Sequence, residues 1–101
     1  MNVEKWNEAD GMLTEGALRR KLEARGYSVN RYVYPMGTYF PEHTHYIDKI
    51  DAVLSGRFRM VVEGCEVILE AGDCISVPRG TSHSAEVIGK EPVVSLDAKK
   101  D

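Results

Sequence analysis

The sequence predicts an all-β protein, a sandwich or barrel of short strands, with one α-helix near its start. Three observations carry this prediction. A helical period of apolar residues is confined to residues 14–25. From residue 28 onwards the period changes to two, with turn residues at intervals of roughly 8 to 12 residues. The length of 101 residues suits one compact domain.

The helix is expected over residues 14–25, TEGALRRKLEAR. Thr14 is a good N-cap because its hydroxyl can accept a hydrogen bond from a free backbone N–H of the first turn. Leu18 and Leu22 form a narrow apolar stripe one turn apart. Gly26 suits the C-terminal stop, since glycine adopts the positive φ that ends many helices. The helix should therefore bury one face and expose the other.

A dense basic cluster lies on this helix, at Arg19, Arg20, Lys21 and Arg25. Cations in the second half of a helix oppose the negative end of its dipole, and Glu15 can pair with Arg19 one turn later. We therefore interpret the cluster as a solvated helix face. Because the net charge is −3 and no other basic patch is present, we expect no nucleic-acid partner.

Two further patterns concern the compartment. No signal-peptide pattern and no apolar run close to the roughly 20 residues of a membrane span are found, so we expect a cytoplasmic protein with no membrane partner. Cys65 and Cys74 stand alone, outside any CxxC motif. In a reducing compartment we expect both to be buried thiols that pack as small apolar groups, not a disulfide.

Short β-rich runs follow one another along the rest of the chain. They are separated by glycine and proline, the residues that close strands with turns. The runs cover residues 27–34, 51–55, 57–63, 65–70, 74–77, 84–88 and 93–96. We expect a helical extension over residues 1–27, a β-barrel over residues 28–96 and a frayed tail over residues 97–101.

Two histidines stand one residue apart in HTHYIDK, residues 43–49. On a strand, alternate side chains point to the same side, so His43 and His45 would face the same way at a separation that one metal ion can span. An isolated HxH is weak evidence, because two such rings often face solvent. The third and last histidine, His83, follows in GDCISVPRGTSH.

The spacing around these histidines resembles the two motifs of the cupin superfamily, G-x5-H-x-H-x3/4-E-x6-G and G-x5-P-x-G-x2-H-x3-N. Eight positions match, separated by an intermotif stretch of 15 residues from Arg57 to Ala71. The matching residues are Gly37, His43, His45 and Gly56 in the first motif, and Gly72, Pro78, Gly80 and His83 in the second. The resemblance covers residues 28 to about 96 and leaves the helix outside it.

The resemblance implies a fold and a site. Cupins are small jelly-roll barrels, double-stranded β-helices whose antiparallel sheets leave few free edges. In the family, the histidines of both motifs converge inside the barrel. For this chain that implies a metal site formed by His43, His45 and His83, whose imidazoles favour a divalent transition metal such as zinc, nickel, iron, manganese or copper.

Two family positions differ in this sequence. Lys49 stands where the first motif has glutamate, and Val87 stands where the second has asparagine. Val87 suits the core of a strand, but an ammonium beside a metal dication is repelled, and burying it also carries a desolvation cost. Either Lys49 faces inward and pairs with a carboxylate such as Asp51, or a bulge turns it outward and brings Asp48 inward as a fourth ligand.

Three hypotheses for function remain open. In the first, His43, His45 and His83 bind a metal and leave positions for water or a small ligand. In the second, the site is metal-free, and Lys49 with the histidines binds a small anion, as in a sensor module. In the third, the barrel is a structural or dimerisation unit. The fold alone does not choose among them.

An enzyme would also need groups that orient a substrate or move protons. Candidates in the sequence are Lys49, Asp51, Tyr32, Tyr34, Tyr39 and Arg59. We expect Tyr39 to pack at the barrel mouth and Arg59 to face solvent, and no combination of these residues names a reaction. We expect a small-molecule ligand in the barrel, and a homodimer formed through sheet edges or a shared face.

Overall fold

The computed structural model describes residues 2–101. Its elements, in chain order, are a short 3-10 helix η1 (Glu8–Asp10), α1 (Glu15–Glu23), β1 (Ser28–Tyr34), β2 (Tyr39–His43), β3 (Asp48–Ser55), β4 (Arg57–Val62), β5 (Cys65–Leu69), β6 (Cys74–Val77), β7 (His83–Ile88) and β8 (Val93–Lys100). The strands form two four-stranded antiparallel sheets. We call β1-β8-β3-β6 the first sheet and β2-β7-β4-β5 the second sheet.

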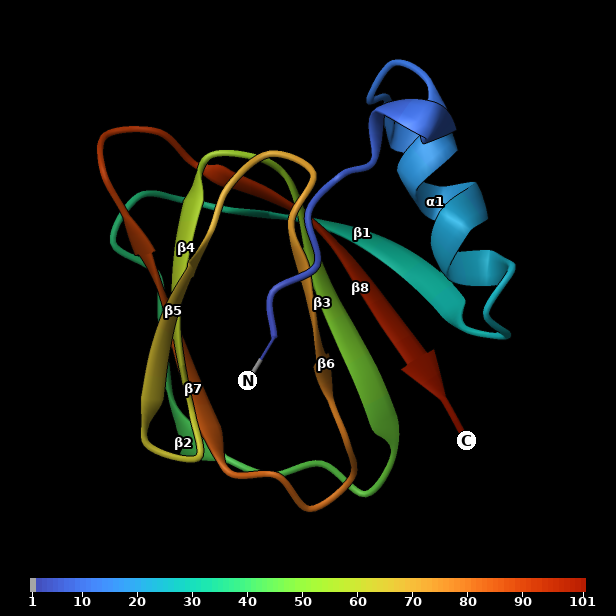
Figure 1. Ribbon diagram of the computed structural model, residues 1–101. Helices are drawn as coiled ribbons and strands as arrows, with labels where there is room; N and C mark the ends of the chain where they lie inside the picture. The colour runs from blue at the N-terminus through green and yellow to red at the C-terminus, as the bar shows by residue number, and fades with distance from the viewer. Residues whose placement is uncertain (1) are drawn as a thin grey trace.

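The two sheets face each other, and α1 lies outside the first of them (Figure 1). The prediction of an all-β jelly roll with one N-terminal α-helix is therefore confirmed. The expected closure is not, because within residues 2–101 the two sheets are not closed into a barrel. The arrangement is a sandwich: the two sheets are held together by the side chains packed between them, not by backbone hydrogen bonds from one sheet to the other.

Apolar side chains from both sheets fill the interior, as alternation along strands with one inward face requires. The buried members of this inner cluster are Val53, Phe58, Met60, Val62, Leu69, Ile75, Val77, Ala85, Val87 and Val93. Val87 is 4% exposed, so the interpretation of this position as a core residue is confirmed.

The first sheet is buried on its outer face as well, because α1 covers it. Leu18 and Leu22 are each 1% exposed and pack against outward-facing residues of β3, β6 and β8. Those residues are Ile50, Ala52, Cys74, Leu96 and Ala98. The helix begins as expected, since the Thr14 hydroxyl accepts a hydrogen bond from the backbone N–H of Ala17 at 3.1 Å. Strands β3 and β8 are thus covered on both faces.

The basic cluster is used within the chain. Lys21 pairs with Asp10 and Arg25 pairs with Glu4, each at 3.1 Å. Arg19 donates to the backbone carbonyl of Val29 at 2.8 Å. These contacts tie the helix to the N-terminal segment and to β1, which agrees with a solvated helix face.

Two expectations about particular segments are wrong. Residues 97–101 do not fray from their start, because β8 continues to Lys100 and pairs with β3 over that length. Cys65 was expected to be buried but is exposed at the start of the edge strand β5. Cys74 is only 3% exposed, and both thiols are free. A search of residues 2–101 found no helix of the length and apolar character that crossing a membrane requires.

Candidate metal centre and adjoining cavity

The three histidines come together at one end of the sandwich. His43 is the last residue of β2, and His83 is the first residue of β7 and its direct cross-strand partner. His45 lies two residues beyond the end of β2, in the loop that leads to β3. The sequence argument placed both members of the HxH pair on a strand. That placement is wrong for His45, although its ring still faces the other two.

The geometry of the cluster is compact. One nitrogen from each of the three rings lies within 4.8 Å of the others. The Nε2 atoms of His43 and His45 are 3.0 Å apart, and the rings of His43 and His83 have centroids 4.2 Å apart. Two nitrogens bound to one tetrahedral zinc at about 2.0 Å would lie roughly 3.3 Å apart. The separations in the cluster can accommodate one shared ion.

Backbone carbonyls set the orientation of two of these rings. The Nδ1 of His43 lies 2.6 Å from the carbonyl oxygen of Pro41, and the Nδ1 of His83 lies 2.9 Å from that of Thr81. A ring that donates its Nδ1 proton to a carbonyl is left with a lone pair on Nε2. Metal-binding histidines ordinarily make such a hydrogen bond with the ring nitrogen that does not bind the metal. The donor set therefore fits a divalent transition metal.

The surroundings of two of the rings, His45 and His83, favour their neutral form. Burial, then the positive charge of Lys49, lowers the pKa of His45. Burial also lowers the pKa of His83, against the opposing effect of its hydrogen bond to the Thr81 carbonyl. Because a metal competes with protons for the same lone pair, a lowered histidine pKa favours binding at neutral pH.

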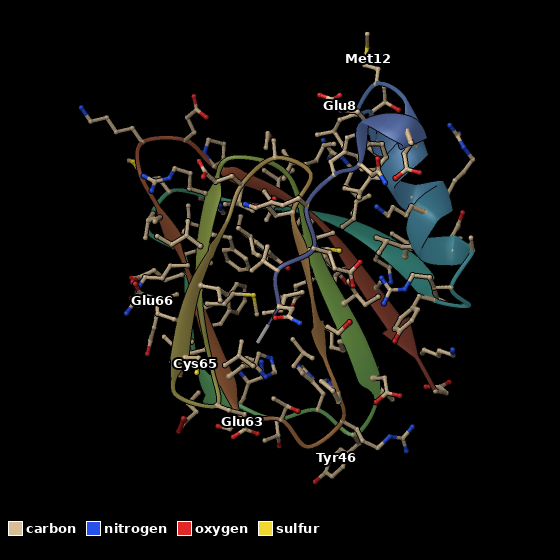
Figure 2. The ribbon with its side chains drawn as sticks, in the orientation of Figure 1. Glu8, Met12, Tyr46, Glu63, Cys65 and Glu66 are labelled. Carbon is tan, nitrogen blue, oxygen red and sulfur yellow. The ribbon has the colours of Figure 1, made fainter. Side chains whose placement is uncertain are left out.

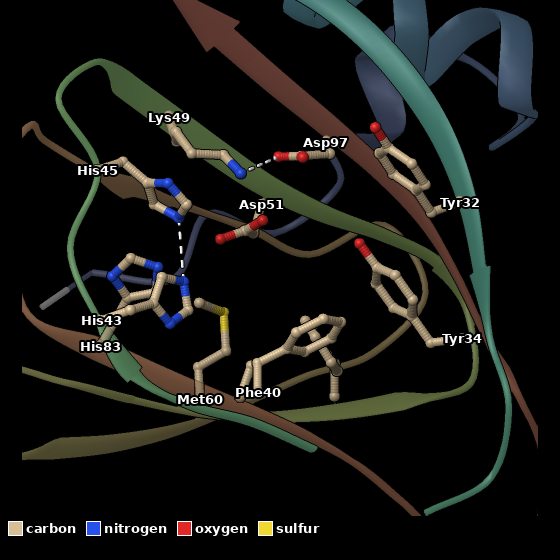
Figure 3. A pocket seen from close by; sticks show the side chains of 12 residues that line it. Tyr32, Tyr34, Phe40, His43, His45, Lys49, Asp51, Met60, His83 and Asp97 are labelled. Carbon is tan, nitrogen blue, oxygen red and sulfur yellow. Dashed lines mark hydrogen bonds and ion pairs between the residues drawn. The ribbon is translucent and has the colours of Figure 1, made fainter. Parts of the chain in front are cut away.

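A cavity of about 270 Å³ adjoins the histidines between the two sheets. Figure 3 shows its charged side chains on one side and its apolar side chains on the other. The lining residues are Tyr32, Tyr34, Phe40, His43, His45, Lys49, Asp51, Phe58, Met60, His83, Ala85 and Asp97. The cavity thus has a histidine end, a charged wall from the first sheet and an apolar wall from the second sheet.

Lys49 points into this cavity and has a carboxylate partner. Its Nζ lies 2.7 Å from Oδ1 of Asp97, and the two side chains are only 13% and 18% exposed. The ammonium is close but not aligned for a hydrogen bond, so Oδ1 of Asp97 is buried with no hydrogen-bond partner. Asp48 lies apart from the cavity lining and accepts a hydrogen bond from the backbone N–H of Arg79 at 2.9 Å. Of the two orientations considered for Lys49, the structure shows the inward one.

Asp51 lies beside this pair and not in it. It is the direct cross-strand partner of Asp97, so two carboxyl groups face the cavity side by side. Burial raises the pKa of Asp51 to about 6, although the positive charge of Lys49 acts in the opposite direction. The side chain therefore gains and loses its proton close to neutral pH.

Other candidate residues divide between the cavity and the surface. Tyr32 and Tyr34 line the cavity from β1, and burial followed by the charges of Asp97 and Asp51 raises the pKa of Tyr34, so its hydroxyl stays protonated. Arg59 pairs with Glu66 and Glu86 on the outer side of the second sheet. Tyr39 is 59% exposed and does not line the cavity. Figure 2 shows the side chains of the described residues in the orientation of Figure 1.

Asp97 is the functional candidate that the sequence argument missed. It falls in DAKKD, which reads as a polar tail. The available signal was the alternation of Leu96 and Ala98 around it, which continues the β-pattern by two residues and directs Asp97 inward. Asp97 faces Lys49 only because β8 pairs with β3, a pairing that sequence spacing does not reveal.

Comparison with protein families gave one match. A family model described as a cupin domain matches residues 30–99. No curated protein matches the sequence.

Solved structures share the fold at low sequence identity. Acireductone dioxygenase from Bacillus anthracis, with a cadmium ion in its active center, is 23% identical with a TM-score of 0.74, over 96% of this chain and 76% of that one. A Cupin 2 conserved barrel domain protein from Salinispora arenicola is 24% identical with a TM-score of 0.66, over 74% and 63%. KdgF from Halomonas sp. is 24% identical with a TM-score of 0.65, over 74% and 70%.

The lengths of these matches also matter. Against eight such structures the chain spans between 56% and 76% of their length, and less than two thirds of five of them. At these identities the likeness shows the fold alone.

Proposed function

The chain belongs to the cupin family, and from that premise we propose that it is a metal-binding cupin whose cavity takes a small-molecule ligand. His43, His45 and His83 would hold a divalent transition ion. The observation that carries the proposal is the convergence of three imidazole nitrogens within 4.8 Å of one another in the lining of one cavity. Two of the three rings have a backbone carbonyl partner at Nδ1, which leaves Nε2 as the atom that can bind an ion.

Imidazole donors favour zinc, nickel, iron or copper over calcium or magnesium, which prefer oxygen. Three protein ligands leave coordination positions for water or a ligand, as in catalytic sites. When bound, such an ion supplies Lewis acidity to an oxygen atom of the ligand. The protein side chains would hold the rest of the ligand, with Lys49 and Asp97 on one wall and Phe40 and Met60 on the other.

Lys49 is compatible with this proposal because of Asp97. The carboxylate of Asp97, 2.7 Å from the Lys49 ammonium, offsets the positive charge of that group. Opposite charges in partial burial interact strongly, so the repulsion that a metal dication would feel from Lys49 alone is reduced. Asp97 thus offsets the positive charge of Lys49 but does not replace the negative charge that a glutamate would carry at position 49, and it is not placed as a ligand.

Metal content tests the proposal directly. Protein purified without chelators or a histidine tag is expected to contain close to one equivalent of transition metal by elemental analysis, and His83→Ala is expected to lose it. Tyr46→Ala is the matched control, since Tyr46 lies next to His45 and is 96% exposed. The chain has only three histidines, so no other imidazole can replace the site. Metal content that is the same in His83→Ala and in the native chain would refute the proposal.

A second candidate function has one supporting observation, the single ammonium group among the cavity-lining residues. Under this alternative the cavity is metal-free and Lys49 binds a small anion. Lys49→Glu separates the two. If metal is bound only in Lys49→Glu and not in the native chain, the anion-binding alternative is favoured. Comparable metal content in both proteins supports the proposed metal site.

A further inference from the structure

The inward face of the first sheet carries charge where a sandwich core is ordinarily apolar. Asp51 on β3 and Asp97 on β8 are direct cross-strand partners, and Lys49 precedes Asp51 by two residues on the same face. Like charges directly opposite each other destabilise a sheet. Farther along this face Val53 and Val93 are fully buried, so the fold itself does not require charge here. A departure that lowers stability and faces a cavity indicates a binding role.

The charged wall has hydrogen-bonding capacity that the protein does not use. Oδ1 of Asp97 is buried beside the Lys49 ammonium, at 2.7 Å, but accepts no aligned hydrogen bond from it. Asp51 lines the same cavity beside it. An ionised carboxylate only accepts hydrogen bonds, so the groups that complement this wall are donors such as hydroxyl or amino groups.

The opposite wall of the cavity, formed by the second sheet, is apolar and suits C–H groups of a ligand. Phe40 and Phe58 meet edge to face with ring centroids 6.3 Å apart. In Figure 3, Met60 lies between Phe40 and the histidines. A ligand that satisfies both walls needs donors along one side and C–H groups along the other. Hydroxylated carbon chains have this character, whereas planar apolar molecules do not.

The charge at the site chooses between neutral, cationic and anionic ligands. Among the lining residues, Asp51 and Asp97 with the ammonium of Lys49 leave one net negative charge. A dication held by the histidines changes this to one net positive charge. A ligand with a single negative charge would then neutralise the site, provided that its charge lies at the histidine end, where Lys49 also is.

We propose that the cavity binds a small polyhydroxylated monocarboxylate, with its carboxylate group next to the histidines and Lys49 and its hydroxyl groups on Asp51 and Asp97. The carboxylate part of this inference rests on the metal binding proposed above. The hydroxyl part rests on the two aspartates alone. The cavity of about 270 Å³ has the size expected for a small-molecule ligand.

A set of four-carbon probes separates these requirements. Threonate carries a carboxylate and hydroxyl groups, erythritol carries hydroxyl groups only, butyrate carries a carboxylate only, and Tris carries hydroxyl groups with a positive charge. Dissociation constants would be measured by NMR titration at pH 7, with zinc-loaded protein and with protein treated with a chelator and then freed of it. In the zinc-loaded protein threonate should bind about tenfold or more tighter than butyrate, because hydrogen bonds to charged groups are strong.

Removing the metal should change the order of charged probes. Zinc-free protein is expected to prefer Tris to threonate, while the affinity for neutral erythritol changes least. Asp51→Asn and Asp97→Asn should each weaken neutral erythritol about tenfold, whereas butyrate should not weaken, because each change removes a negative charge from the site. Asp48→Asn is the matched control, since Asp48 lies on the same strand and does not line the cavity. Circular dichroism establishes that each variant is folded.

The outcomes distinguish the two proposals. If elemental analysis shows no zinc uptake, the metal proposal fails, and erythritol binding that depends on Asp51 and Asp97 still supports the hydroxyl part. If zinc is taken up but butyrate binds as tightly as threonate, the ligand class is wrong while the metal site stands. Erythritol affinity that is equal in native protein, Asp51→Asn and Asp97→Asn also overturns the ligand class. The native protein's probe order decides even if a variant fails to fold.

Discussion

Replacing Lys49 with methionine should destabilise the protein by leaving two carboxylates without their cation. Lys49 and Asp97 are 13% and 18% exposed and 2.7 Å apart, so the pair is mostly buried. Removing one partner of a buried pair costs about 3 to 5 kcal/mol. We expect about 3 kcal/mol, at the lower end, because the cavity admits water to part of both side chains.

The second change isolates the cause. In the Lys49→Met background, Asp97→Asn removes the charge that lost its partner and one of two like charges that lie directly opposite each other. The double variant should therefore recover about 2 kcal/mol relative to Lys49→Met. Asp97→Asn alone should cost about 2 kcal/mol, because Lys49 then keeps its charge beside a neutral amide.

The assay is urea unfolding at pH 7.5 with a chelator present, so that metal binding does not contribute to stability. Asp48→Asn is the control, and as a surface change it should stay within about 0.5 kcal/mol of the native chain. The reasoning is refuted if Lys49→Met is as stable as the native chain, or if adding Asp97→Asn to it restores nothing. Either result would mean that the pair is a surface-like contact.

Three further predictions use the same unfolding assay or simple chemistry. Gly56→Ala should lower the free energy of unfolding by more than about 3 kcal/mol, and Gly64→Ala by only about 1 to 2 kcal/mol. Both glycines have positive φ, but a Cβ on Gly56 would lie 2.3 Å from the backbone carbonyl oxygen just before β8, while a Cβ on Gly64 would meet open space. Equal losses would contradict this reasoning. Because its carboxyl pKa is raised, the folded protein holds the Asp51 proton more tightly than the unfolded chain does, so metal-free native protein should lose stability as the pH rises from about 4 to the pKa of about 6. Asp51→Asn should remove that loss and be about 2 kcal/mol more stable than the native protein at pH 7. Parallel pH profiles of stability in the two proteins would argue against this. Ellman's reagent at pH 8 should modify exposed Cys65 quickly and buried Cys74, whose pKa burial raises to about 11, only at the rate of opening; Cys65→Ala should abolish the fast phase, and a persisting fast phase would show that Cys74 is accessible.

The fold could be predicted from the sequence because its signals are local. The Thr14 cap, the Leu18 and Leu22 stripe and the change of period after Gly26 each arise within a few residues, and all match the structure. The glycines and prolines marked the ends of the strands for the same reason. The prediction that the strands close into a barrel was wrong. Closure depends on the distance between the two sheets, and that distance is set by the side chains packed between them.

The site was harder to predict where its contacts cross between strands. The spacing of His43, His45 and His83 indicated a cluster, and the structure brings these rings together. The partner of Lys49 lies 48 residues away on β8, so neither parity nor proximity along the chain could choose Asp97 over Asp51. A polar ending also concealed the last strand, because charged residues at a chain end look the same whether they fray or pair.

The helix α1 lies outside the stretch that the family model matches, residues 30–99, and contributes no residue to the cavity. Leu18 and Leu22 nevertheless cover the back of β3 and β8, the two strands that carry the charged wall. A chain shortened to the matched stretch would present Ile50 and Leu96 to water directly behind that wall. The recognisable domain is therefore smaller than the unit that keeps the ligand cavity in shape, and transplanting the cavity to another protein would require transferring the helix with it.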